Sequence, residues 1–365
     1  MKKLDVIRKK YRLRAVKANW LNELKRQTRT YASTSKGSSH KTGDRREKII
    51  APPIISIYDF NATKSDAFVQ TMAFLDNIKK RFKLANCYID FSGTVSVTAA
   101  AIVVVYAAIE QAGVGRLGKA DIIWSKSFRI NVLLRQSNVP KLIRGYKVSY
   151  DLTSVNHMPV VSSVGNTMMD EIVDFIQNRI YENMSDETEH AYGDAVSETI
   201  NNVGFHAYPE RDVSQRKWWL MCHTQGKKLY LAIYDTGVGI PRTVIERRWF
   251  MDSFKFSYPQ AFRDLIAENP GKEKTLLTSI IPSRIKDSEL IGMSMRGDVS
   301  RTREEKHGQG SKSILALVEE TAEGLLWVFS NGGVYRFDQA VKKPEMYDLP
   351  MSFPGTLVQW NIELP

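Results

Sequence analysis

Three polar side chains recur every fourth residue in a stretch whose apolar residues follow a helical period. Glu198, Asn202 and His206 therefore share one face of a helix predicted around residues 191–207, and the apolar side chains form another face. An asparagine oxygen suits Mg²⁺, a hard cation that keeps most of its waters for phosphates. A glutamate one turn earlier is placed to act as a general base on a water near such a phosphate. By itself, the pattern is also typical of a solvated helix face.

A second polar position follows a strand pattern at residues 229–234. Asp235 is followed by Gly237 and Gly239 at alternate positions and then by Ile240, so the backbone there can lie close to a flat ligand. A carboxylate accepts a hydrogen bond from the amino group of adenine, but it repels the carbonyl oxygen of guanine. The motif therefore predicts adenine selectivity, with a simple tight turn as the alternative.

The third motif is a glycine loop that opens an apolar helix pattern at residues 314–318. Gly308 and Gly310 alternate in this loop, and Ser311 and Lys312 follow them. Backbone N–H groups at such a helix start, together with the positive end of the helix dipole, can cradle a phosphate. The loop lacks the glycine spacing of a Walker loop and of a dinucleotide-binding fingerprint, so by itself it is a weak signal.

A fourth motif, Gly355-Thr356, lies at the entry to the last strand pattern. In their order along the chain, the four motifs resemble the N, G1, G2 and G3 boxes of the GHKL ATPase superfamily. This family groups gyrase, heat-shock chaperone, histidine kinase and mismatch-repair ATPases with the anti-sigma-factor kinases. The resemblance covers most of residues 160–365 and implies a Bergerat fold, an α/β sandwich in which a mixed sheet carries helices on one face and ATP lies between them.

The resemblance also implies a role for each matched residue. Asn202 would hold Mg²⁺, Asp235 would accept the adenine amine, and Glu198 would be the catalytic base. The other implied nucleotide-binding positions are His206, Gly237, Gly239, Ile240, Gly308, Gly310, Ser311, Lys312 and Thr356.

The family places its ATP lid between the G1 and G2 boxes, here residues 241–307. The end of this segment carries four basic residues that could reach a γ-phosphate, with a solvated charged loop as the alternative: Arg296, Arg301, Arg303 and Lys306. The paired glycines Gly292 and Gly297 predict a mobile lid.

Residues 51–155 alternate strand and helix patterns, which indicates a smaller α/β domain. The run from Cys87 to Thr94, followed by an Ala-rich helix, resembles a STAS domain, the fold of anti-sigma-factor antagonists. Phosphoregulated STAS proteins carry Asp-Ser at the start of that helix, whereas this chain has Val97-Thr98. We therefore expect Thr98 to cap the helix rather than to be phosphorylated.

The basic character of the protein lies in its first 50 residues. This segment holds 16 of the 52 Lys and Arg residues but 4 of the 40 Asp and Glu residues, so it carries the whole net charge of +12. Apolar residues within residues 4–24 predict a basic amphipathic helix, and the polar composition of residues 32–48 predicts a linker. Such an arm suits an anionic partner, whether nucleic acid, an acidic protein or a membrane surface, and a packing helix is the alternative.

The sequence thus predicts an arm at residues 1–50, a STAS-like domain at 51–155 and an ATP-binding domain at 160–365. Two cysteines without CxxC spacing and the absence of a secretory signal favour the cytoplasm, and the apolar run at residues 97–109 is too short to span a bilayer. No histidine lies in a two-helix segment of the sensor-kinase type, which disfavours that branch of the family.

The function predicted from these observations is a nucleotide-dependent regulatory switch that binds MgATP and hydrolyses it slowly. The alternatives are a serine/threonine protein kinase of the anti-sigma-factor type and a nucleic-acid or partner-binding module with a regulatory ATP site. A homodimer is compatible with the sequence.

Overall fold

The computed structural model describes residues 46–60, 66–83, 86–114, 118–148, 150–153, 158–180, 186–247, 249–271, 284–296, 310–319, 321 and 323–364. The predicted basic helix and most of its linker therefore lie outside the described residues. The described residues form a mixed α/β structure with one parallel and one antiparallel main sheet. Among them, no helix combines the length and the apolar composition needed to cross a membrane.

The first part of the described chain is built on a three-stranded parallel sheet with the order β1-β3-β5. Its strands are β1 (Glu47–Ile50), β3 (Cys87–Asp90) and β5 (Ala120–Ile123), and a separate parallel pair joins β2 (Ile54–Ile55) to β4 (Ser96–Val97). The accompanying helices are α2 (Asp66–Arg81), α3 (Ala99–Gly113), α4 (Phe128–Gln136) and α5 (Val139–Ile143). Because β1 begins at Glu47 and buries Ile49, the boundary predicted at residue 50 is too late.

The second part is built on a five-stranded sheet with the order β6-β7-β8-β10-β9. Its strands are β6 (Val161–Val164), β7 (Lys217–Gln225), β8 (Lys228–Asp235), β9 (Leu325–Asp338) and β10 (Lys343–Glu363). All four neighbouring pairs are antiparallel, so the expectation of a mixed sheet is wrong for the described strands. For two of the four pairs the reason is a tight connection, because β7 and β8, and β9 and β10, are joined as hairpins.

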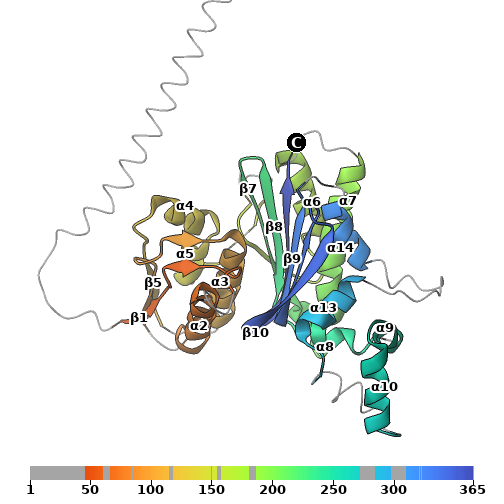
Figure 1. The fold of residues 1–365 in the computed structure, drawn as a ribbon. Coiled ribbons are helices and arrows are strands. Elements are labelled where there is room, and N and C mark those ends of the chain that lie inside the picture. Colours follow the sequence, from red (N-terminus) through yellow and green to blue (C-terminus); the bar gives the residue numbers. More distant parts are fainter. Residues whose placement is uncertain are drawn as a thin grey trace, which may run out of the picture. The chain divides into compact units, whose positions relative to one another are not determined.

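Helices of the second part cover one face of this sheet, where Figure 1 shows α6, α7 and α14 together. They are α6 (Met169–Phe175) with the π-helical turn η2 (Ile176–Ile180), α7 (Asp186–Asn202) with the π-helical turn η3 (Val203–Ala207), and α14 (Gly310–Glu319). A 3₁₀ turn, η4 (Val213–Gln215), precedes β7. Between β8 and α14 lie α8 (Ile240–Val244), α9 (Phe250–Ser257), α10 (Pro259–Glu268) and α13 (Asp287–Arg296).

Alternate residues along the strands serve two different cores. On β8, Leu231 and Ile233 pack with α7 and α14, whereas Ala232 and Tyr234 join the core that contains α3. The indole Nε1–H of Trp219 on β7 donates to Glu110 Oε2 on α3 at 2.7 Å. The larger sheet is therefore covered by the α6, α7 and α14 layer on one face and by the smaller α/β part on the other.

The residue types of Asn331-Gly332-Gly333 favour a hairpin turn, because Asn and Gly accept positive φ at little cost, but the structure has no turn there. These residues lie inside β9, opposite a break in the register of β10, and the chain reverses after Asp338 instead. The glycines serve a close approach, because a Cβ on Gly333 would lie 2.3 Å from the backbone nitrogen of Ser288 at the start of α13. The backbone N–H of Gly332 donates to the Asp287 carboxylate at 2.7 Å.

Candidate functional site

The helix predicted around residues 191–207 is present as α7 and its continuation η3. Tyr192, Val196 and Ile200 anchor it to the sheet, all of them buried. Glu198 and Asn202 lie on a neighbouring face and are only partly buried. After Asn202 the helix widens into a π-helical turn, a local form that often accompanies functional sites. His206 lies in this wider turn.

Two rows of residues cross the sheet below this helix. Ile233 on β8 pairs with Val358 on β10, which pairs with Val328 on β9, so three apolar side chains form a flat row. The next row on the same face of the sheet, two residues away on each strand, is polar. It consists of Asp235 on β8, Thr356 on β10 and Ser330 on β9. The Thr356 and Ser330 hydroxyl oxygens lie 3.1 Å apart.

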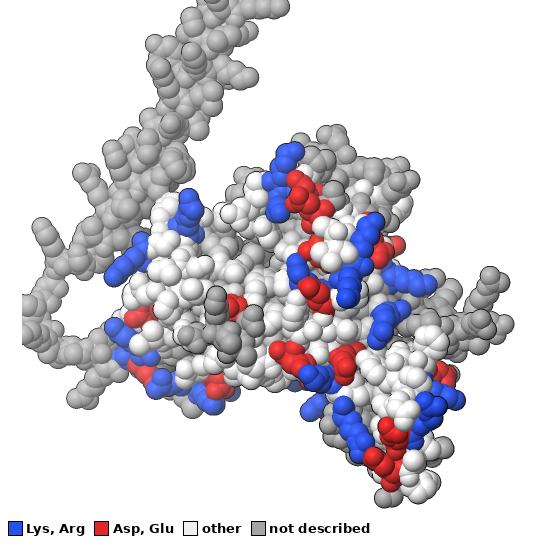
Figure 2. All heavy atoms as spheres, in the orientation of Figure 1, with Lys and Arg blue, Asp and Glu red and all other residues white. Residues whose placement is uncertain are grey.

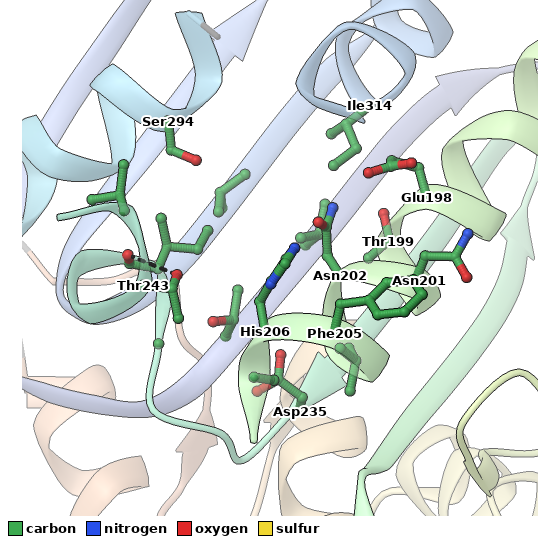
Figure 3. A pocket seen from close by; sticks show the side chains of 18 of the residues that line it. Glu198, Thr199, Asn201, Asn202, Phe205, His206, Asp235, Thr243, Ser294 and Ile314 are labelled. Carbon is green, nitrogen blue, oxygen red and sulfur yellow. Dashed lines mark hydrogen bonds between the residues drawn. The ribbon is translucent and has the colours of Figure 1, made fainter. Parts of the chain in front are cut away.

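A cavity of about 470 Å³ lies between these rows and the helices. Figure 3 shows Glu198, Asn202 and His206 along one wall, with Ile314 beside Glu198, Asp235 at the base, and Thr243 and Ser294 on the opposite side. The predicted site residues that line it are Glu198, Asn202, His206, Asp235, Gly239, Ile240 and Thr356. Glu198 and Asp235 thus open onto the same cavity, although 37 positions separate them in the sequence printed above.

Asp235 is the buried carboxylate of this cavity, with 5% of its surface exposed. Burial raises its pKa to about 7, although the backbone N–H groups of Gly237 and Thr356 both donate to the carboxylate and oppose the shift. The Gly237 N–H lies 2.7 Å from Asp235 Oδ1. A ligand N–H group that reaches this carboxylate would find an acceptor already oriented by backbone donors.

Glu198 also has an altered protonation equilibrium. Partial burial raises its pKa, the side-chain hydrogen bond from Asn202 opposes this, and the nearby charge of Asp194 adds to the rise. The carboxylate and the carboxamide therefore contact each other one helical turn apart. A carboxylate with a raised pKa is a stronger base for a proton of water than an ordinary surface glutamate.

The predicted glycines bring the backbone close to neighbouring elements. Gly237 does not line the cavity, because it packs on the end of η3, where its Cβ would lie 2.2 Å from the carbonyl oxygen of Ala207. Gly239 has φ +90° and its backbone approaches the Asn331 amide. Gly355 has φ +80°, and its Cβ would lie 2.0 Å from the carbonyl oxygen of Asp235. All three glycines therefore fix the path of the chain around Asp235 and Thr356.

The glycine loop is described only in part. Gly308 lies outside the described residues, and Gly310 begins α14. The side chain of Ser311 lies outside the described set, and Lys312 is exposed and does not line the cavity. Four residues after Gly310, Ile314 does line it, so α14 contributes a side chain to the cavity.

The segment predicted as a lid is more structured than a loop. Residues 241–307 contain α9, α10 and α13 and most of α8, and these helices share a small core that includes Phe250, Phe254 and Leu290. Gly292 predicted mobility, but it is buried inside α13, where its Cβ would lie 2.4 Å from the Met346 sulfur. Arg296 ends α13, while Arg301, Arg303, Lys306 and Gly297 lie outside the described residues.

Several residues of the cavity belong to none of the four sequence motifs. Arg247 and Trp249 follow α8 and line the cavity, and Arg247 is the one Lys or Arg that does so among the described residues. Phe205 also lines it, yet 69% of its surface is exposed. Arg247 and Trp249 come shortly after the Asp235 motif in the sequence, and this was the available signal. A helix that begins at the end of this loop brings the residues that follow it toward the same cavity.

No protein-family model matches the chain, and no curated protein matches it at a significant level.

Proposed function

We propose that this cavity binds MgATP in the manner of the GHKL superfamily and that the protein is a nucleotide-dependent regulatory switch with slow hydrolysis. The observation that carries the proposal is the shared cavity of Glu198, Asn202, Asp235 and Thr356, which come from α7, β8 and β10. Its volume of about 470 Å³ falls in the usual range for small-molecule sites.

The base would lie on the apolar row of Ile233, Val358 and Val328, with its edge toward the polar row. Asp235 would accept the adenine amino group, and the Thr356 hydroxyl lies on the neighbouring strand at the same level. Adenine fits this arrangement because it presents a donor where guanine presents a carbonyl oxygen. The carboxylate therefore selects the base.

The phosphates would lie toward α7 and the start of α14. No group of three or more His, Cys, Asp or Glu side chains in the described part of the chain could hold a metal ion by itself. A Mg²⁺ ion would take one protein oxygen, from Asn202, and its other ligands from phosphates and water. When bound, the ion would neutralise phosphate charge, and Glu198 would take a proton from the attacking water.

Nucleotide binding and product analysis on the full chain test this proposal. We expect wild-type protein to bind adenosine and ATP, and to release free phosphate slowly from ATP. Asp235→Asn should weaken adenosine binding roughly 10- to 100-fold, because an amide donor replaces one oxygen of a charged acceptor. Asp194→Asn is the matched control, since Asp194 is exposed on the same helix as Glu198 and does not line the cavity. A wild-type protein that binds neither ligand would contradict the proposal.

The same assay separates hydrolysis from protein phosphorylation. Labelled phosphate from the γ-position would appear free in the first case and on protein in the second. Thr98, at the start of α3, has a buried hydroxyl oxygen, so we do not propose this residue as an acceptor of the γ-phosphate.

A second candidate function concerns the basic arm. Its charge of +12 contrasts with the rest of the chain, which is neutral overall. Figure 2 agrees with this, because groups of both signs lie interspersed over the described face. We propose that the arm binds nucleic acid, and a truncated chain that starts at Arg46 loses residues 1–45, with a net charge of +11, without cutting β1. Truncation should abolish salt-sensitive binding of a 20-base-pair DNA duplex and leave adenosine affinity unchanged. Salt-sensitive binding of polyglutamate instead of DNA would indicate an acidic protein partner.

A further inference from the structure

The last two turns of α3 contain two polar residues, Glu110 and Gln111. Buried apolar side chains run along this helix as far as Ile109, and Glu110 and Gln111 follow. Gln111 Nε2 donates to Thr236 Oγ1 at 2.7 Å. Thr236 directly follows Asp235, so a side chain from the smaller α/β part contacts the loop that begins at the carboxylate of the cavity.

Thr236 is held from a second side by Tyr208. The Thr236 backbone N–H donates to the Tyr208 hydroxyl at 2.9 Å, and this hydroxyl donates its own proton to the Lys217 carbonyl oxygen at 2.7 Å. The Thr236 hydroxyl lies 3.2 Å from the Tyr208 oxygen. Since the tyrosine proton is already committed, the threonine hydroxyl must donate to Tyr208 and accept from Gln111. The donor and the acceptor of each hydrogen bond from Gln111 to Lys217 are then fixed.

The other contacts of the loop come from the larger sheet and its helices. The Val238 N–H donates to the Ala207 carbonyl oxygen at 2.8 Å, and the Ile240 N–H donates to Ser330 Oγ at 2.9 Å. Gln111 therefore makes the side-chain contact that joins this loop to the smaller α/β part.

We propose that Gln111 is a positioning residue that, through Thr236, fixes the Asp235 loop for recognition of the base and couples α3 to the nucleotide site. This inference rests on the proposed function, since it concerns the same cavity. A substitution that removes the hydrogen bond between Gln111 and Thr236 lets Asp235 turn away from the base. By reciprocity, a base bound at Asp235 stabilises the end of α3.

A double-mutant cycle with adenosine as the probe tests the positioning role. Gln111→Leu removes the donor, and Thr236→Val removes the acceptor while keeping the backbone N–H to Tyr208. We expect each variant to weaken adenosine binding about 5- to 10-fold, and the double variant to bind no more weakly than either single variant. Gln111→Asn, which only shortens the side chain, should give a smaller loss and covers the case in which Gln111→Leu fails to fold.

Glu110→Gln is the matched control, because Glu110 lies on the same helical turn and contacts β6 and β7 instead of Thr236. Its adenosine affinity should equal that of the wild type. Wild-type affinity in Gln111→Leu, or additive losses in the double variant, would overturn the inference. Failure of the wild-type protein to bind adenosine would instead contradict the proposed function.

Hydrogen exchange provides a readout that a merely structural residue would not alter. Adenosine should slow amide exchange at the C-terminal end of α3 in the wild type and in Glu110→Gln. In Gln111→Leu and in Thr236→Val, adenosine at saturating concentration should leave that exchange unchanged. Equal slowing in all four proteins would overturn the coupling.

Discussion

Helices α3 and α7 pack against opposite faces of the same five-stranded sheet, and they do so differently. The side chains of α3 from Ala100 to Ile109 are all buried, and its polar residues at the C-terminal end bond to the sheet and its loops. On α7, Glu198 and Asn202 bond to each other and open onto a cavity. What distinguishes α7 is that its polar side chains face a space large enough for a ligand.

The largest expected effect concerns the carboxylate of α7. Glu198→Gln keeps the size and the contact with Asn202 but removes the base, so ATP hydrolysis should fall roughly 10²- to 10⁴-fold while ATP affinity stays near that of the wild type. Single-turnover release of labelled phosphate, together with equilibrium ATP binding, measures both quantities. Unchanged turnover would show that another group takes the proton. The polar side chains of α7 would then have no catalytic role, as in α3.

Truncation of a buried isoleucine on each helix separates stability from binding. Ile102→Ala on α3 and Ile200→Ala on α7 remove fully buried side chains, so each should lower the free energy of unfolding by about 2–5 kcal/mol. Only Ile200→Ala should also weaken adenosine binding, because Thr199 and Asn201 on either side of it line the cavity. Urea denaturation and adenosine titration of the two folded variants make the test. A similar loss of affinity in Ile102→Ala would contradict a purely structural role for the middle of α3.

The pH dependence of base binding sharpens the contrast further. Burial raises the pKa of Asp235 to about 7, so its carboxyl is largely protonated below that pH in the empty cavity. The ionised form is the stronger acceptor for an amino group, so adenosine affinity should fall by up to about tenfold per pH unit below pH 7 and level off above it. Adenosine is the right probe because it carries no titrating phosphate. In Asp235→Asn the remaining affinity should be independent of pH over the same range, whereas a persistent slope would implicate another group.

The sequence predicted the polar positions of this site better than it predicted the elements around them. Glu198, Asn202, Asp235 and Thr356 could be found because regular spacing within a helix, or glycines beside a strand end, mark them locally. The pairing that brings Asp235 beside Thr356 joins β8 to β10 across more than a hundred residues, and no local pattern encodes it.

The glycines show why other predictions failed. Gly333 and Gly292 suggested a turn and a mobile lid, yet both lie where another element passes too close for a Cβ. A glycine that the chain needs for its backbone angles and one that it needs for close packing look alike in a sequence. Arg247 and Trp249 were missed for a related reason, because they reach the cavity through the direction of α8 rather than through a motif.

The smallest expected effect is at Glu110, the polar residue of α3 that contacts the sheet. Ser162 Oγ and Trp219 Nε1–H donate to this carboxylate, and Lys217 lies 2.7 Å from it in a partly exposed ion pair. Glu110→Gln keeps an acceptor oxygen for those donors, so the free energy of unfolding should fall by less than about 1 kcal/mol. Glu110→Ala should cost about 1–3 kcal/mol, because it leaves the buried indole N–H without its partner.

Urea midpoints in low and high salt distinguish the contributions of charge and of hydrogen bonding at Glu110. If hydrogen bonding dominates, the small loss in Glu110→Gln disappears in high salt and the loss in Glu110→Ala persists. Equal losses in the two variants in low salt that both shrink in high salt would mean that the charge itself holds α3 to the sheet. The polar end of α3 would then depend on an electrostatic contact with the sheet, and the two helices would differ in charge as well as in the cavity space beside them.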